Sequence, residues 1–119
     1  MALRVDVRVP ACRPIPQVVD FVRQCDEAGL DGVGLLDSQL IVRDTYATMA
    51  VLARETSRIK LTASVTNPVT RHPSVLASAM ATVAELAPGR VEFVLGSCYS
   101  AVRTIGVPVA TSAQMRDSV

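Results

Sequence analysis

Apolar and charged residues alternate at the start of the chain, from residue 3 to residue 9, and Pro10 ends the alternation. A period of two places successive side chains on opposite faces, so this pattern predicts a half-buried strand. Residues 16–28 then carry apolar side chains three and four positions apart, which predicts an amphipathic helix. Gly29 follows at the position of a helix C-cap.

Short apolar runs recur along the chain and predict three further strands. Each run follows a helical segment closely enough to form a strand parallel to the one before it. The runs are residues 33–36, 59–65 and 91–95. Between the first two, Asp44 is placed to cap a helix whose apolar face ends at the polar segment 54–58.

Proline and capping residues set the bounds of the later elements. Pro73 stands directly after His72 at the first position of a helix, where its missing N–H costs nothing, and this helix runs to about Leu86. After Gly96 the pattern becomes irregular. Thr111 is then placed to cap a last helix.

Four strand–helix units with short connections predict one continuous α/β domain over residues 1–119, built on a parallel sheet. Two architectures share this order, an open doubly wound sheet and an eight-stranded barrel, and periodicity does not separate them. An open sheet that binds a dinucleotide would carry a glycine-rich turn after its first strand. Residues 9–14 contain prolines and no glycine, so a dinucleotide-binding Rossmann fold is disfavoured.

Charge and composition argue against several classes of function. A net charge of +1 and an aromatic content of 3% provide neither the field nor the stacking surface that nucleic-acid binding uses. Three widely spaced cysteines and one histidine predict neither a disulfide framework nor a metal site. No apolar stretch approaches the length of a membrane span. We expect a cytoplasmic protein with a small-molecule substrate and with no metal, nucleic-acid or membrane partner.

Ligands of parallel α/β structures bind at the carboxyl ends of the strands, and polar residues of this chain gather there. Asp37 directly follows an apolar strand, where a carboxylate either orients a ligand and moves protons or serves as a turn residue. Thr66 and Asn67 offer hydrogen-bond donors and acceptors, and a structural turn explains them equally well. Gly96 and the small polar residues after it would let backbone N–H groups approach an anion or a planar ring.

Two residues have types that are common in catalysis, but their neighbours in the sequence favour structural roles. His72 precedes a proline at a helix start and has no acidic partner nearby, so a helix-entry role is favoured over a general base. Cys98 has no basic residue nearer than Arg103 to lower the pKa of its thiol, so a free, half-buried thiol is favoured over a nucleophile. The catalytic residues stay unassigned.

Several ordered segments resemble the luciferase-like family of flavin- and deazaflavin-dependent oxidoreductases. They include DGVGLLDSQ from residue 31, TNPVTRHP from residue 66 and APGRVEFVLG from residue 87. The similarity is to the methylenetetrahydromethanopterin reductase-like branch, which uses the deazaflavin coenzyme F-420, and it extends over residues 15–119. It implies the N-terminal four βα units of a (β/α)8 TIM barrel.

The resemblance implies that the protein binds F-420, or alternatively FMN, and transfers hydride to or from a small organic substrate, as an oxidoreductase or monooxygenase. It also implies a non-prolyl cis peptide at Ser64–Val65. The residues that it assigns to the cofactor lie at three strand ends: Asp37, Ser64, Val65, Thr66, Asn67, Gly96, Ser97, Cys98, Tyr99 and Ser100. Where the family pattern commonly reads Gly-x-Gly-Asp-Ser, Cys98 replaces the second glycine and Tyr99 replaces the carboxylate.

The length of the chain differs from that of a complete barrel, which needs about 250 residues. Four strands alone would leave two unpaired sheet edges and one uncovered apolar face. We therefore expect this chain to pair with another copy as a homo-oligomer, to complete a barrel with a partner, or to have little activity alone. The alternative function is a non-catalytic partial barrel that acts by self-association.

Overall fold

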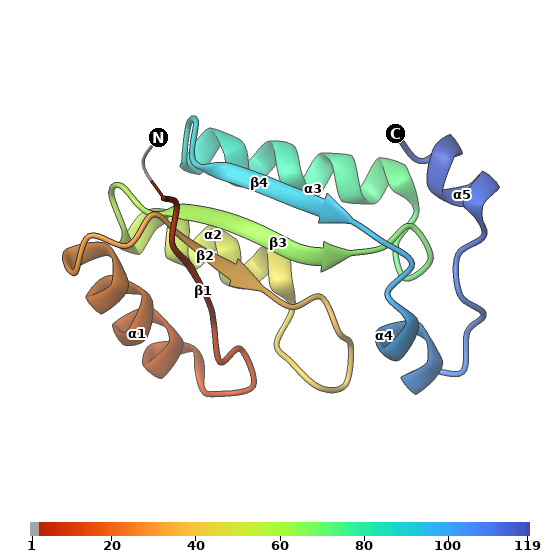
Figure 1. The fold of residues 1–119 in the computed structure, drawn as a ribbon, viewed down its shortest axis with the longest axis horizontal. Helices are drawn as coiled ribbons and strands as arrows, with labels where there is room; N and C mark the ends of the chain where they lie inside the picture. The colour runs from red at the N-terminus through yellow and green to blue at the C-terminus, as the bar shows by residue number, and fades with distance from the viewer. Residues whose placement is uncertain (1–2) are drawn as a thin grey trace.

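The computed structural model describes residues 3–119 and contains four parallel strands, in sequential order across one sheet (Figure 1). The strands are β1 (Asp6–Arg8), β2 (Gly32–Leu35), β3 (Lys60–Thr66) and β4 (Val91–Leu95). They are connected by the helices α1 (Ile15–Glu27), α2 (Thr45–Glu55) and α3 (Pro73–Leu86). Two short helices follow β4, namely α4 (Tyr99–Thr104) and α5 (Ser112–Asp117). The predicted alternation of strands and helices is confirmed.

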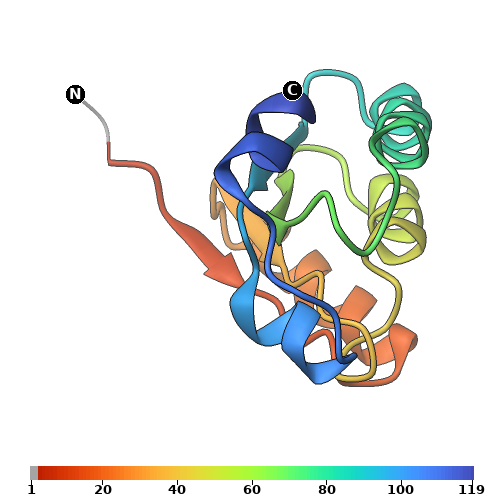
Figure 2. The same ribbon diagram turned by 90° about the vertical axis from the view of Figure 1, so that its right-hand side faces the viewer.

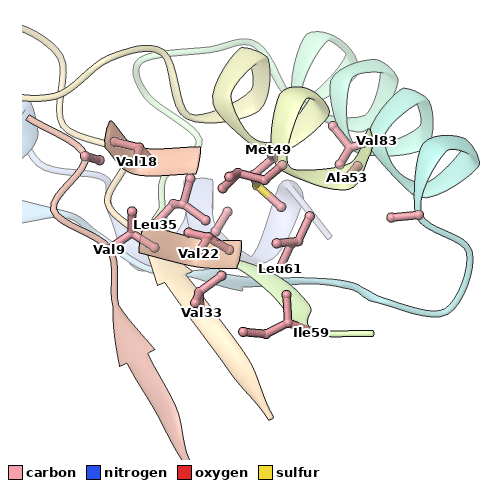
Figure 3. Close-up of a cluster of buried hydrophobic side chains, with 14 of the residues drawn as sticks. Val9, Val18, Val22, Val33, Leu35, Met49, Ala53, Ile59, Leu61 and Val83 are labelled. Carbon is pink, nitrogen blue, oxygen red and sulfur yellow. The ribbon is translucent and has the colours of Figure 1, made fainter. Parts of the chain in front are cut away.

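The three connecting helices cover one face of the sheet, whereas α4 and α5 lie beyond the carboxyl ends of the strands (Figures 1 and 2). Alternate residues of the central strands point toward these helices, and Val33, Leu35 and Leu61 are fully buried there. They pack with apolar residues of α1 and α2, among them Val22 and Met49 (Figure 3). The core therefore forms from aliphatic side chains, between the sheet and the helices.

The predicted helix-capping residues occupy their expected positions. Asp44 accepts hydrogen bonds from two backbone N–H groups in the first turn of α2, and His72 Nδ1 accepts one from the N–H of Ser74. Thr111 forms a capping box at the start of α5. Gly29 follows α1 with φ +84°, a conformation that glycine adopts without steric cost. The helix-entry role predicted for His72 is confirmed.

Two elements differ from the prediction. The first strand comprises three residues instead of residues 3–9, because pairing with β2 extends only from Asp6 to Arg8 and the other side of β1 is an unpaired edge. The irregular segment expected after Gly96 contains α4, so that expectation was wrong for Tyr99–Thr104. This helix buries two adjacent residues, Ala101 and Val102, which is too short a pattern to show a helical period.

The sheet face opposite the helices is charged, so the expectation of an uncovered apolar face was wrong. Arg4 reaches across the sheet to Glu92, with Nη2 at 2.8 Å from Oε2, and it also pairs with Asp6 on its own side. Lys60 Nζ lies 2.8 Å from Oε1 of Glu92. Hydrogen bonds from Arg4 and Lys60 lower the pKa of Glu92 to about 2. Gly32 makes room for this cluster, because a Cβ there would lie 2.6 Å from Asp6 Oδ1.

One carboxylate holds the end of α1 against the start of β3. Asp26 accepts hydrogen bonds from the backbone N–H groups of three successive residues, Ser57, Arg58 and Ile59. Burial raises the pKa of Asp26, but these donors together with the Arg58 guanidinium outweigh it and hold the pKa below its ordinary value.

Among residues 3–119, no helix is both long and apolar enough to cross a membrane.

We predict that Asp26→Asn destabilises the fold by about 1–3 kcal/mol at neutral pH, because the amide replaces a charged acceptor of three N–H groups. The folded pKa lies below the unfolded one, so this contribution is present above the unfolded pKa and is lost as the pH falls through the folded pKa. Urea unfolding at several pH values should show the two proteins converging below about pH 4. Asp20→Asn, at an exposed position, is the control. A difference that stays constant with pH would contradict the prediction.

Candidate functional site

The carboxyl ends of the strands surround a cavity of about 320 Å³. Its lining comes from the end of β1, the loop after β2, the end of β3 and the segment around the start of α4. The lining residues are Arg8, Leu36, Asp37, Ser38, Ile41, Val65, Cys98, Ser100 and Ala101. Four of the residues assigned from the sequence therefore meet here, namely Asp37, Val65, Cys98 and Ser100.

Asp37 is the centre of a buried polar network. Its side chain is 1% exposed, and Nη1 of Arg71 lies 2.9 Å from Oδ1 and 3.0 Å from Oδ2. Thr66 Oγ1 donates to Oδ2 at 2.8 Å, and Gln39 Nε2 donates to Oδ1 at 2.8 Å. A buried carboxylate is stable only when it is paired and hydrogen-bonded, and both conditions are met. Asp37 is therefore held in one orientation by its neighbours.

Two residues that sequence reasoning missed complete this network. Arg71 also pairs with Asp44, the cap of α2, and its guanidinium carbon lies 4.6 Å from the centre of the Tyr46 ring. The Tyr46 hydroxyl lies 2.6 Å from Thr66 Oγ1. Because Thr66 gives its one proton to Asp37, Tyr46 is the donor in that bond. Burial raises the pKa of Tyr46 to about 12, which keeps the phenol neutral.

The end of β3 is irregular where the resemblance placed a cis bond. The Ser64–Val65 peptide is cis, which confirms that prediction. The pairing of β3 with β4 shifts register at the same point, between Ser64 and Thr66. Gly96 packs directly on this bulge, because a Cβ on it would lie 2.7 Å from Cγ1 of Val65. Gly96 is thus required by the packing of Val65, a reason that the sequence pattern did not reveal.

Cys98 lines the cavity, and the buried Asn67 lies next to it. Cys98 has φ +48°, in the left-handed region, and its Sγ donates to the carbonyl of Val65 at 3.3 Å. Burial raises the pKa of the Cys98 thiol, and Asn67 lowers it by less, so the thiol stays protonated at neutral pH. Asn67 is fully buried, and its Oδ1 accepts two backbone N–H groups of the following turn. Its Nδ2 has no hydrogen-bond partner within residues 3–119.

The other residues assigned from the sequence lie around the cavity rather than on its lining. Ser64 lines a second cavity, of about 390 Å³, on the charged face of the sheet. Thr66 and Asn67 are buried, and Gly96 lies under Val65. Tyr99 is 60% exposed and hydrogen-bonds to Arg103, and Ser97 is exposed; neither lines the cavity. In the described part of the chain, no three His, Cys, Asp or Glu side chains gather as metal ligands would.

Comparison with known proteins gives a consistent set of similarities. The model of the luciferase-like monooxygenase family matches residues 2–119. The 5,10-methylenetetrahydromethanopterin reductase of Methanolobus tindarius is 35% identical over 83 residues, which are 70% of this chain and 25% of that protein. The chain thus spans about a quarter of the length of this curated relative.

Solved structures show the same fold at lower identity. The coenzyme F420-dependent tetrahydromethanopterin reductase of Methanopyrus kandleri matches with a TM-score of 0.84 and 22% identity, over 91% of this chain and 31% of that one. A type II Baeyer–Villiger monooxygenase of Pseudomonas putida, solved with FMN, matches with a TM-score of 0.77 and 21% identity, over 99% of this chain and 37% of that one. The four βα units therefore adopt the fold of part of the TIM barrel of these enzymes.

We predict that Arg71→Met destabilises the protein by about 3–5 kcal/mol, because it leaves the Asp37 carboxylate buried without its counter-charge. The double variant Asp37→Asn with Arg71→Met should recover part of this loss, since the uncompensated charge is then gone. Urea unfolding of the single and double variants measures both effects. Arg54→Met, on the exposed surface of α2, is the control. Additive losses in the double variant would show that the ion pair is not the cause.

We also predict that Gly96→Ala is destabilising, because the new Cβ collides with the side chain of Val65. Gly34→Ala in β2 is the matched control, since its Cβ would lie at an ordinary 3.4 Å from Ser64 Cβ. Thermal unfolding should show a lower Tm for Gly96→Ala and little change for Gly34→Ala. Equal effects of the two substitutions would contradict the packing role of Gly96.

Proposed function

This chain belongs to the luciferase-like monooxygenase family of F-420- and flavin-dependent oxidoreductases, and we propose that it forms the first half of a barrel that binds such a cofactor. The observation that carries the proposal is the cavity at the ends of β1 to β4. It brings the cis peptide at Ser64–Val65, the Asp37 network and the loop around Cys98 to one place. Hydride transfer to or from a small organic substrate is the proposed reaction.

The residues around the cavity fit a planar ring with polar edges. Leu36, Val65 and Ala101 provide apolar contacts, and the hydroxyls of Ser38 and Ser100 provide donors and acceptors. Asn67 lies buried at the same strand end, behind this lining, and its Nδ2 has no hydrogen-bond partner within residues 3–119. When bound, a flavin or deazaflavin would give or accept the hydride. This chain's residues would bind and orient the ring, which is the role that we propose for the assigned cofactor-binding residues.

Asp37 would act in this pocket by positioning its neighbours. Both oxygens of its carboxylate already accept hydrogen bonds from Arg71, Thr66 and Gln39 and are engaged within this network. A general base needs a lone pair that can reach the substrate proton. We therefore propose that Asp37 holds Thr66 and the end of β3 in place and that a group outside this network moves any proton.

We propose F-420 as the cofactor and FMN as the alternative. The named reductase relatives support F-420, and the monooxygenase solved with FMN supports the alternative. The edge of β4 has no neighbouring strand, so we propose that the rest of the barrel comes from further residues, a second copy or a partner chain. A cytoplasmic location is part of the same proposal. Membership of an enzyme family favours this function over a non-catalytic, self-associating protein.

We predict that the protein binds F-420 or FMN saturably, with a dissociation constant below about a millimolar. Cys98→Gly should bind more tightly, because it enlarges the cavity and because glycine adopts the left-handed conformation of this residue freely. Fluorescence titration of both cofactors measures the affinity. Cys12→Ala, at an exposed cysteine, is the control. The absence of saturable binding of both cofactors would refute the proposed function of this chain.

A further inference from the structure

Arg8 is a cation on the charged face of the sheet that has no acidic partner within residues 3–119. The other cations of this face are paired, since Arg4 binds Asp6 and Glu92 and Lys60 binds Glu92. Arg8 makes neither an ion pair nor a side-chain hydrogen bond with the residues that the structure describes. The carboxylates of this face thus form ion pairs with Arg4 and Lys60, whereas the N–H groups of the Arg8 guanidinium have no acceptor within residues 3–119.

Arg8 also lies where two cavities meet. It lines the cavity of about 320 Å³ at the strand ends and the neighbouring cavity of about 390 Å³ on the charged face. Its partner in the register of β2 is Gly34, which has no side chain to fill the space beside it. Arg8 therefore borders the candidate cofactor pocket as well as the cavity on the charged face.

The groups around Arg8 offer more donors than free acceptors. Asp37 lines one cavity, and its two oxygens already accept from Arg71, Thr66 and Gln39. Asp6 and Glu92 line the other, and their carboxylates already accept from Arg4 and, for Glu92, from Lys60 as well. Ser64 lines one cavity, and Ser38 and Ser100 line the other. Hydroxyl donors beside an unpaired guanidinium form an environment for an oxyanion, because a guanidinium binds carboxylate and phosphate with two parallel hydrogen bonds.

We propose that Arg8 binds a carboxylate or phosphate group of the ligand that occupies this pocket, so that the ligand is an organic anion. The inference deepens the proposed function and rests on it for the identity of the pocket. The anionic group has two sources, the substrate itself or the phosphate of the cofactor. Enclosure of the cavity by the rest of a barrel strengthens the requirement, because a guanidinium removed from water needs a counter-charge.

The test uses the full chain and the substitutions Arg8→Gln and Arg8→Lys. Acetate and inorganic phosphate serve as probes, acetamide as the neutral control, and the NMR signal of the Arg8 side-chain Nε–H as the readout for the native protein. Isothermal titration compares the variants. Arg54→Gln is the matched control, since Arg54 is also exposed and lies on α2 away from both cavities. Circular dichroism verifies that each variant is folded.

We expect acetate or phosphate to shift the Arg8 signal saturably and acetamide to leave it unchanged. Arg8→Gln should weaken anion binding about tenfold or more, and Arg8→Lys should restore part of it, because lysine keeps the charge and loses the bidentate geometry. Anion binding that is absent in the native protein, or equal in Arg8→Gln and Arg54→Gln, would overturn the proposal.

Titration with riboflavin and FMN identifies the source of the anion. A loss in Arg8→Gln that affects FMN and spares riboflavin supports an Arg8 site for the cofactor phosphate. Affinities of the variant for both flavins that are unchanged from those of the native protein, together with its loss of acetate or phosphate binding, support a site for a substrate anion. Failure of the proposed function has a separate signature, in which the native protein binds the small anions at Arg8 and binds no flavin or F-420.

Discussion

The ion pair between Asp37 and Arg71 is the interaction on which the carboxyl-end structure depends. It joins the loop after β2 to the loop before α3, and Arg71 extends the connection to the start of α2 through Asp44. Thr66 brings the end of β3 into the same network. The network therefore joins the segment of Asp37 and Asp44 to a second segment, that of Thr66 and Arg71. Arg71 lies 34 positions from Asp37 and 27 from Asp44. The Asp37 side of the cavity keeps its shape because both carboxylate oxygens accept hydrogen bonds from the surrounding segments.

The two faces of the sheet differ in role, since one forms the apolar core and the other carries charged residues. The helix-covered face supplies the apolar core, in which residues such as Leu35 and Leu61 lose all contact with water. The opposite face carries the cluster of Arg4, Lys60 and Glu92, together with Arg8. A charged face is stable in contact with water, so the four βα units expose no large apolar surface on the side of the sheet opposite the helices. Within the four strands, the exposed large apolar residues are Phe93 and Val94 of the edge strand β4, and Phe93 is 52% exposed.

Patterns among neighbouring residues predicted most of the helices and strands, whereas contacts between residues far apart in the sequence could not be predicted. A few neighbouring residues are enough to recognise the cap at Asp44, the proline after His72 and the apolar run of β4. Arg71 and Asp37 are 34 positions apart, and no spacing rule joins them. The short helix α4 was not predicted, because its two buried residues are adjacent and do not show a helical period. The cis bond at Ser64–Val65 came from family resemblance, since no propensity of Ser or Val favours it.

The absence of a side chain at Gly32 leaves room for the ion pairs that link the two edges of the sheet. The bare backbone of β2 at this point lets the Asp6 carboxylate lie over the sheet, while Arg4 spans from the segment before β1 to Glu92 of β4. The first and last strands of the sheet are thereby coupled although 88 positions separate Arg4 from Glu92. The three-residue edge strand pairs directly with β2 alone, so this partly exposed ion pair adds a modest second attachment, to β4. Side chains thus link the two edges of the sheet, which share no backbone hydrogen bond.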